Sequence, residues 1–227
     1  MPTDDEEASR LALYVARQLD NLFPDAAAPI TFDNAKLQAA LTRTRRCLAP
    51  VKGLNEFNSL ISGHYATFLY YLSKVVGDQG NALVATKLFL LNKALNGIDL
   101  FYEVAMPNVF LIGHTVGMVF AKAAYADYCV FHQGCTVGRS GEDRPVLRGS
   151  LVMYPNSSVI GRCRVEPNTV LTPGVQLINS DTPGNCLVFS GKSGRPLFKE
   201  AKEDYLARYF LRPLPMLDEA KPKPSIE

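Results

Sequence analysis

The chain has 227 residues and a formal net charge of +2, with 47% hydrophobic and 20% charged residues. This composition allows a substantial buried core and excludes a chain that is disordered throughout. The near-balanced charge excludes a protein that binds nucleic acids or membrane surfaces through its overall charge.

The first 97 residues predict a helical domain. Apolar residues recur there at helical spacing, and capping or breaking residues separate the apolar stretches. The last stretch is followed by Asn96-Gly97, a pair typical of a left-handed helix end. We therefore expect four helices: from Asp4 or Asp5 to about Asn21, from Asp33 or Asn34 to Pro50, from about Asn55 to Val76, and from Ala82 to about Leu95.

Two segments bear on where the protein resides. Met1–Arg10 is acidic and lacks the apolar stretch of a signal peptide. Ala82–Leu95 is the most apolar stretch, but Lys87 and Lys93 interrupt it and it is too short to span a bilayer. We expect a cytoplasmic protein that binds neither membranes nor nucleic acids.

Residues 98–193 repeat with a period of six. In each frame a large apolar residue is followed four places later by a small one. This period fits neither a helix nor an ordinary strand, and is typical of a triangular β-solenoid with about eighteen residues per coil. The large residue should point into the prism, and the small one should occupy a corner. The frames are Val119–Ala123, Tyr125–Cys129, Phe131–Cys135, Met153–Ser157, Val159–Cys163, Val165–Thr169 and Leu171–Val175.

Two parts of the chain depart from this repeat. Between Val137 and Leu147 the hexads stop, and residues 138–146 are polar and rich in glycine, so we expect a loop extruded from the solenoid. Residues 194–227 should form a short amphipathic helix over Leu197–Leu211 and a loose tail from Pro213. The fold class is therefore α+β, with a helical domain, a solenoid and a short C-terminal helix.

The five cysteines show no metal-ligand spacing. Cys129, Cys135 and Cys163 all fall at the small position of the hexad, where a compact apolar side chain fits. We interpret them as core fillers in a reducing compartment rather than as disulfides or metal ligands.

Three short motifs of the solenoid carry residue types suited to chemistry. They are Gly113-His114-Thr-Val-Gly117-Met-Val119, Gln133-Gly-Cys-Thr-Val-Gly138 and Asp143-Arg144-Pro145. These motifs resemble Asp-His-x-x-Gly-x-x-Val, Gln-x-Val-Thr-Leu-Gly and Asp-Arg-His-Pro of the serine acetyltransferases, within the hexapeptide-repeat acyltransferases. The resemblance covers about residues 57–193 and implies that the solenoid is a left-handed parallel β-helix.

The resemblance also implies an activity. In that family three chains assemble side by side, the active site lies between neighbouring prisms, and coenzyme A lies along the coils. An imidazole takes the proton of the acceptor hydroxyl as the acetyl group leaves the thioester, and a carboxylate orients the imidazole. We therefore expect acetyl-CoA as co-substrate, a small-molecule acceptor, and a homotrimer or a dimer of trimers.

His114 is the candidate general base, because a hydroxyl needs a base with a matched pKa near neutral pH. Asp99 is its candidate partner and would fix the ring tautomer. The structural alternatives are an exposed corner histidine and an aspartate that caps the junction between helices and solenoid. His132 should face outward, where it either lines the intersubunit cleft or is an ordinary exposed ring. His64, beside apolar residues of a predicted helix, is expected to be structural.

The extruded loop carries the candidate acceptor-binding residues. By resemblance, Arg144 meets a carboxylate of the acceptor through its planar guanidinium, with Asp143 beside it; a solvated loop arginine is the alternative. The family's Asp before the catalytic His is Gly113 here, and the His between Arg144 and Pro145 is missing. Both missing groups belong to acceptor recognition, so we expect the same chemistry with a changed acceptor.

The candidate contacts of coenzyme A lie along the coils. Lys192 is placed to meet the nucleotide phosphates as a point charge, and Tyr154 is bulkier than the Gly or Ala of the family. The chain has no ATP-type phosphate loop and only three histidines, so we expect no metal. The candidate cofactor-binding residues are Gly138, Tyr154, Asn156, Ser190, Gly191 and Lys192.

The sequence thus favours an acetyl-CoA-dependent O-acetyltransferase of the serine acetyltransferase type. The first alternative is an O- or N-acyltransferase that acts on a sugar or nucleotide-sugar in surface polysaccharide assembly, since the serine contacts are incomplete. The second is a non-catalytic solenoid that scaffolds a partner enzyme, because Gly113 and Tyr154 depart from the family pattern.

Overall fold

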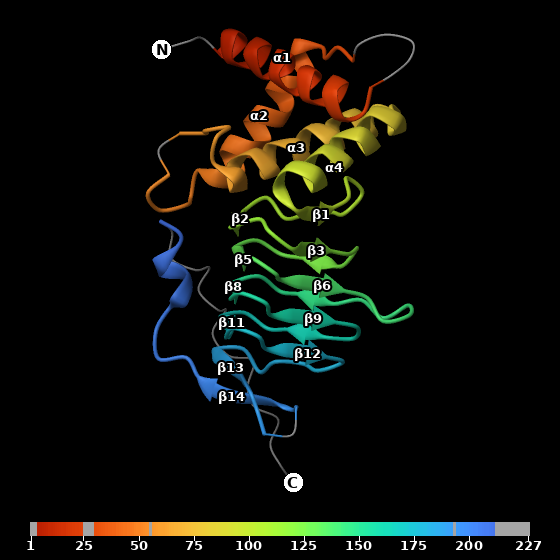
Figure 1. Ribbon diagram of the computed structural model, residues 1–227. Coiled ribbons are helices and arrows are strands. Elements are labelled where there is room, and N and C mark those ends of the chain that lie inside the picture. The colour runs from red at the N-terminus through yellow and green to blue at the C-terminus, as the bar shows by residue number, and fades with distance from the viewer. Residues whose placement is uncertain (1–3, 25–29, 55, 193, 212–227) are drawn as a thin grey trace.

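The computed structural model describes residues 4–24, 30–54, 56–192 and 194–211. Four helices come first, a parallel β-solenoid follows, and a C-terminal segment returns along it (Figure 1). This order confirms the predicted fold class. The tail predicted from Pro213 lies outside the described residues.

Side-chain caps set the helix ends. The helices are α1 (Asp4–Leu22), α2 (Asn34–Leu48), α3 (Ser62–Asp78) and α4 (Ala82–Asn96). The Asp33 carboxylate accepts from the N–H of Ala35 at 3.0 Å and starts α2. Asn81 caps α4 in the same way, and Gly97 ends it in the left-handed conformation with φ 65°.

The third helix begins later than predicted. The expected start is near Asn55, which lies outside the described residues, whereas α3 begins at Ser62. The Asn58 side chain accepts a hydrogen bond from the N–H of Leu60 at 2.8 Å, and Ile61 is extended. An asparagine that bonds to the backbone two residues on favours a turn over a helix.

The solenoid has three parallel sheets, one for each side of the prism. Its strands are β1 (Ile98–Leu100), β2 (Phe110–Gly113), β3 (Met118–Phe120), β4 (Ala124–Tyr125), β5 (Cys129–His132), β6 (Thr136–Gly138), β7 (Val146–Leu147), β8 (Leu151–Met153), β9 (Ser158–Ile160), β10 (Arg164–Val165), β11 (Thr169–Leu171), β12 (Gln176–Ile178) and β13 (Cys186–Ser190). The first sheet has the order β1-β3-β6-β9-β12, the second β4-β7-β10 and the third β2-β5-β8-β11-β13. Successive coils therefore stack strand on strand (Figure 1).

Columns of large residues fill the prism. The inward column of the first sheet is Leu100, Phe120, Val137, Val159 and Leu177, and that of the third sheet is Ile112, Phe131, Met153, Leu171 and Val188. All of these side chains are buried, as the hexad predicts.

The first predicted frame is wrong by one residue. Val119 faces outward with 42% of its surface exposed, and Phe120 takes the inward position. The side from Phe120 to Tyr125 is one residue shorter than a hexad. Because successive strand residues face opposite sides, a shift of one residue exchanges the buried and exposed positions.

The cysteines fill corners, as predicted. Cys129, Cys135 and Cys163 are buried free thiols, as are the two others. Burial raises the pKa of Cys129 to about 12, so its thiol is protonated and unreactive at neutral pH.

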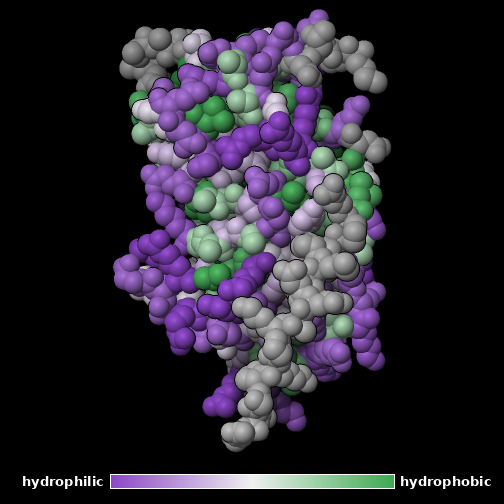
Figure 2. Space-filling model, turned by 180° about the vertical axis from the view of Figure 1, so that it is seen from behind, coloured by the Kyte–Doolittle hydropathy of each residue, from purple (hydrophilic) through white to green (hydrophobic). Residues whose placement is uncertain are grey.

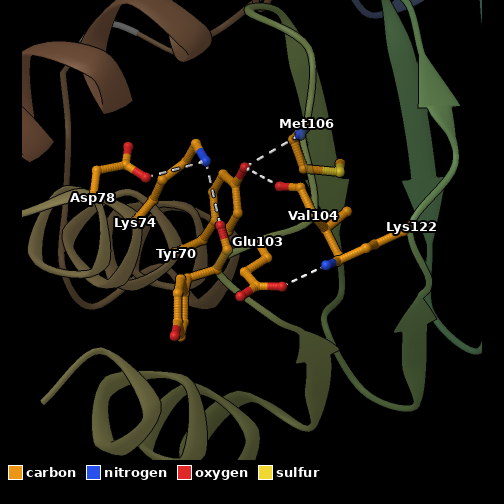
Figure 3. A network of polar contacts seen from close by, with 8 residues as sticks. Tyr70, Lys74, Asp78, Glu103, Val104, Met106 and Lys122 are labelled. Carbon is orange, nitrogen blue, oxygen red and sulfur yellow. Dashed lines mark hydrogen bonds and ion pairs between the residues drawn. The ribbon is translucent and has the colours of Figure 1, made fainter. Parts of the chain in front are cut away.

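A polar network joins α3 to the first coil (Figure 3). The buried Tyr70 hydroxyl donates to the carbonyl of Val104 at 2.7 Å and accepts from the N–H of Met106 at 3.2 Å. Because a buried hydroxyl needs such partners, this contact fixes the first coil against the helices. The network also contains Lys74, Asp78, Tyr102, Glu103 and Lys122.

The predicted helix over Leu197–Leu211 is wrong. Pro196–Glu200 forms β14, which pairs antiparallel with β13, and only Tyr205–Arg208 forms a 3-10 turn, η1. β13 ends the stack and would otherwise present an unpaired edge. A strand that returns through the tight turn between Gly191 and Arg195 covers this edge, and pairing at an edge overrides helical periodicity.

Residues 201–211, which we call the strap, run along the outer face of the third sheet (Figure 1). Leu206 and Phe210 are buried there. The strap also reaches the end of the helical domain, since Lys52 N–H donates to the Tyr209 carbonyl at 2.8 Å. The outward side chains that it covers are Val130, Val152 and Val170.

The surface is mostly hydrophilic with scattered apolar patches when seen from behind (Figure 2). Val116, Val119 and Ile178 are exposed apolar residues of the first sheet and its corner. Over the described residues, none of the helices combines the length and the hydropathy needed to cross a bilayer.

Candidate active site

His114 lies at a corner of the solenoid, directly after β2. Its backbone is left-handed, with φ 57°, and its side chain is exposed. Asn, Asp and His are the side chains that enter this conformation most often. The corner therefore projects the imidazole into solvent rather than into the prism.

Asp99 lies on β1, which pairs with β3 of the next coil. Its carboxylate pairs with the Lys93 ammonium at 2.7 Å. Within the part of the chain that the structure describes, no hydrogen bond joins Asp99 to His114. The two predicted partners thus lie at the start of the first coil and at its closing corner, and are not joined.

His132 lies on β5, in register with Gly113 on β2. Its ring stacks on Tyr154, with centroids 5.3 Å apart and planes at 7°, and its Nε2 lies 3.1 Å from the Tyr209 hydroxyl. Burial lowers the pKa of His132, and the neighbouring His114 lowers it further. His132 faces out of the prism as predicted, but the strap half-buries it.

One edge of the solenoid connects His114 with the last coil. Ile112 and Val188 share a register column that passes through β2, β5, β8, β11 and β13, which makes four strand spacings. His114 and Ser190 each follow these residues by two positions. Ser190 therefore lies on the same edge as His114, about 19 Å away at roughly 4.8 Å per spacing.

Gly191 and Lys192 continue from this edge into the turn before β14. Lys192 is exposed and Gly191 is half-buried. The predicted base and the predicted phosphate-binding lysine thus lie at opposite ends of one edge, where a single extended ligand can reach both.

Gly138 and Asn156 belong to the walls and corners of the coils. Gly138 ends β6, where an added Cβ would meet Ile160 at 3.5 Å, an ordinary contact, so packing does not require a glycine. Asn156 is an exposed corner residue with φ 61°. A Cβ on Gly134 would lie 2.1 Å from the Asn156 Oδ1, so the amide would have to move, and the φ of 70° at Gly134 also favours a glycine.

The extruded loop leaves the prism between β6 and β7 and projects as a hairpin (Figure 1). Ser140 and Asp143 exchange two backbone hydrogen bonds of 3.0 Å. The side chains of Asp143 and Arg144 are exposed. None of the ion pairs between described residues includes Arg144, so its guanidinium is available to an anionic ligand.

From the sequence, no role was assigned to two residues beside His132. Tyr209 lies 77 positions from His132 in the chain, and its segment was expected to be an amphipathic helix, so no local pattern indicated the contact. Gln133 was noted as part of a motif but without a role. Its Oε1 is buried and has no hydrogen-bond partner among the described residues.

The predicted structural histidine lies in the helical domain. His64 is buried on α3, and its Nδ1 accepts from the N–H of Asn58 at 3.2 Å. A cavity of about 1010 Å³ lies nearby, between α1, α2 and residues 54 and 56–60, and no predicted site residue lines it. In the described ranges no group of three or more His, Cys, Asp or Glu side chains is arranged to hold a metal ion.

Two curated proteins are similar to the chain in sequence. No protein-family model matches the chain. The chain is 26% identical to the serine acetyltransferase of Synechococcus elongatus over 148 residues, which are 63% of this chain and 57% of that protein. It spans about half the length of the curated relatives that it matches.

Solved structures extend the likeness over most of the chain. The serine acetyltransferase of Neisseria gonorrhoeae superposes with a TM-score of 0.61 at 18% identity, over 86% of this chain and 90% of that one. The chain has the fold of the serine acetyltransferases. A serine acetyltransferase of Brucella abortus in complex with coenzyme A superposes with a TM-score of 0.63 at 14% identity, over 88% and 84% of the two chains. The resemblance to serine acetyltransferases in the solenoid motifs is therefore confirmed in the fold.

Proposed function

We propose that the chain is an acetyl-CoA-dependent O-acetyltransferase of the serine acetyltransferase type. One observation carries the proposal: the exposed imidazole of His114 lies at one end of a solenoid edge whose other end carries Lys192. An extended thioester along this edge places its reacting end at the imidazole and its phosphates at the ammonium. A serine acetyltransferase of the same fold is in complex with coenzyme A, which supports coenzyme A as the carrier of the acetyl group.

His114 is the proposed general base. Its ring takes the proton of the acceptor hydroxyl as the hydroxyl oxygen bonds to the thioester carbonyl carbon. The carbon–sulfur bond then breaks, the acetyl group stays on the acceptor oxygen, and the leaving thiolate takes the proton back from His114. A backbone N–H stabilises the oxyanion formed between these two events.

Asp99 is the proposed orienting partner of His114. This role requires the carboxylate to turn from Lys93 to the imidazole when substrates bind. The Lys93 and Asp99 side chains are 53% and 35% exposed, and an exposed ion pair of this kind contributes about 0–1 kcal/mol. The exchange of partners therefore costs little.

The remaining site residues are proposed as ligand contacts. Arg144 binds a carboxylate of the acceptor, with Asp143 beside it, because the loop exposes both side chains. His132 contacts the acceptor at the His114 corner. The proposed contacts of coenzyme A are Gly138, Tyr154 and Asn156 for its pantetheine arm, and Ser190, Gly191 and Lys192 for its nucleotide.

The proposed assembly is a homotrimer, or a dimer of trimers, in the cytoplasm. The exposed Val116, Val119 and Ile178 of the first sheet supply an apolar surface for neighbouring prisms. The five cysteines are all free, which suits a reducing compartment.

Release of thiol from acetyl-CoA tests the proposal, with L-serine, amino sugars and nucleotide-sugars compared side by side. We expect turnover with L-serine, and His114→Ala should lower it by about 100- to 10,000-fold. Lys192→Ala should raise the KM for acetyl-CoA, whereas Lys199→Ala on β14 is the matched control that should not. Near wild-type turnover by His114→Ala would exclude the base.

A second candidate is an O- or N-acyltransferase that acts on a sugar or nucleotide-sugar. Gly113 favours it, because no side chain at this position is available to meet the amine of an amino acid. Turnover with a sugar and none with L-serine in the same screen would select this function. Failure to bind acetyl-CoA in calorimetry would instead select a non-catalytic scaffold.

A further inference from the structure

His132 and Gly113 occupy the same outward position on consecutive coils of the third sheet. A Cβ added at Gly113 would lie 3.4 Å from the His132 Nδ1. With glycine at this position, no side chain from the preceding coil covers that edge of the ring. Of the two ring nitrogens, Nε2 is under the strap and Nδ1 faces the corner that carries His114.

The strap supplies the hydrogen-bond partner of the His132 Nε2, and the direction of the Tyr209 hydroxyl proton sets the ring tautomer. The Tyr209 hydroxyl donates its single proton to the Tyr154 hydroxyl at 3.4 Å. Toward the His132 Nε2, at 3.1 Å, the Tyr209 oxygen can then only accept. A neutral imidazole has one N–H, so Nε2 bears it and Nδ1 carries a lone pair. Burial and the nearby His114 lower the pKa of His132 and keep the ring neutral at pH 7.

Nδ1 has no hydrogen-bond partner among the residues that the structure describes. No hydrogen bond between described residues engages it, and the adjacent Gln133 Oε1 is a buried acceptor that also lacks a partner there. The Nδ1 lone pair, which no described group engages, is therefore open to a hydrogen-bond donor of a ligand at this corner.

We propose that His132 Nδ1 accepts a hydrogen bond from the acceptor substrate, and that Tyr209 is the positioning residue that keeps the ring proton on Nε2. The inference rests on the proposed function, since it states how the acceptor is held beside His114. It assigns a substrate class: the acceptor carries a second hydroxyl or amino group next to the hydroxyl that is acetylated. A neutral ring accepts from either group, so a cationic amine is not required.

Imidazole nitrogen-15 spectra test the tautomer without any need for activity. The chain has three histidines, so substitution of His64 and His114 assigns the signals. In the wild type above pH 7 we expect protonated Nε2 and unprotonated Nδ1 at His132. Tyr209→Phe removes the partner of Nε2–H and should shift the proton toward Nδ1, whereas Tyr205→Phe in the same turn should not. A wild-type proton on Nδ1 would overturn the proposal.

Kinetics with the acetylated acceptor test the contact itself. His132→Phe keeps a ring on Tyr154 but removes both nitrogens, and should raise the KM for the acceptor by about 10-fold while the KM for acetyl-CoA stays constant. Adding the acceptor should shift the Nδ1 resonance of the wild type. An unchanged KM for the acceptor or an unshifted resonance would overturn the contact. If no acceptor is acetylated, the proposed function fails, and the spectra still decide the role of His132.

Discussion

The strap should detach locally when its anchor is removed. Phe210 is 2% exposed, and its ring meets Tyr128 edge-on at a centroid distance of 5.4 Å. It also packs with the outward valines of the third sheet. Phe210→Ala removes most of this buried surface. The solenoid strands remain paired to one another without the strap, so the loss should be confined to residues 201–211.

The size of the effect follows from burial. Truncation of a buried phenylalanine to alanine costs about 3–5 kcal/mol, and we take the lower end because the strap lies on the surface of the domain. A loss of about 3 kcal/mol in the free energy of local opening makes exchange of the protected amides faster by roughly two orders of magnitude. Global unfolding should change far less.

Two amides report this opening directly. Lys52 N–H donates to the Tyr209 carbonyl at 2.8 Å, and Leu211 N–H donates to the Pro50 carbonyl at 2.7 Å. Hydrogen exchange at both should accelerate in Phe210→Ala. Phe198→Ala on β14 is the matched control, because Phe198 is 37% exposed and does not touch the valines. Unchanged exchange at Lys52 and Leu211 would refute the reasoning, as would equal acceleration throughout β5.

Three further outcomes are expected. Gly134→Ala should lower the melting temperature more than Gly174→Ala, because both glycines have positive φ but only Gly134 faces an atom, the Asn156 Oδ1; equal losses would contradict the steric argument. Val119→Asp should reduce the mass measured by sedimentation if the first sheet is the assembly surface, and an unchanged mass would exclude that surface. Burial and His114 lower the pKa of His132 in the folded state, so unfolding takes up a proton and stability falls as pH drops from 6.5 through the lowered pKa; His132→Phe should reduce this dependence in thermal melts, with the buried His64 supplying the remainder, and an equal slope would contradict it.

The solenoid could be predicted because its period is a local constraint. Each side of a coil needs a large residue that points inward and a small residue at the corner. A single hexad, such as the one from Phe131 to Cys135, therefore carries both requirements. The six-residue spacing is interrupted where one side of the prism is shorter or longer than six residues. The side before Tyr125 is one residue short, and nothing in the spacing of Val119 and Phe120 shows which of two adjacent apolar residues is buried.

The C-terminal segment could not be predicted in the same way. Its conformation depends on the solenoid that precedes it: β14 covers the edge of β13, and Phe210 packs with Val130, Val152 and Val170, which lie 80, 58 and 40 residues earlier in the chain. The apolar spacing over Leu197–Leu211 is compatible with a helix, but pairing at an open sheet edge takes priority. The same distance explains why Tyr209 was not anticipated beside His132.

The sequence also did not show that two features of the candidate site are connected. In the sequence, Gly113 and Tyr154 are two separate departures from the serine acetyltransferase motifs. In the structure they lie on either side of His132 in one outward column, since Gly113 pairs with His132 and the ring stacks on Tyr154. A side chain at residue 113 would lie against the His132 Nδ1, since its Cβ would be 3.4 Å away, and a glycine at residue 154 would leave the ring without a stacking partner. The two departures are therefore consistent with one change, in which an imidazole held by tyrosines takes the place of a side chain at residue 113. Under the proposed function, this change alters acceptor recognition and leaves the proposed base, His114, in place.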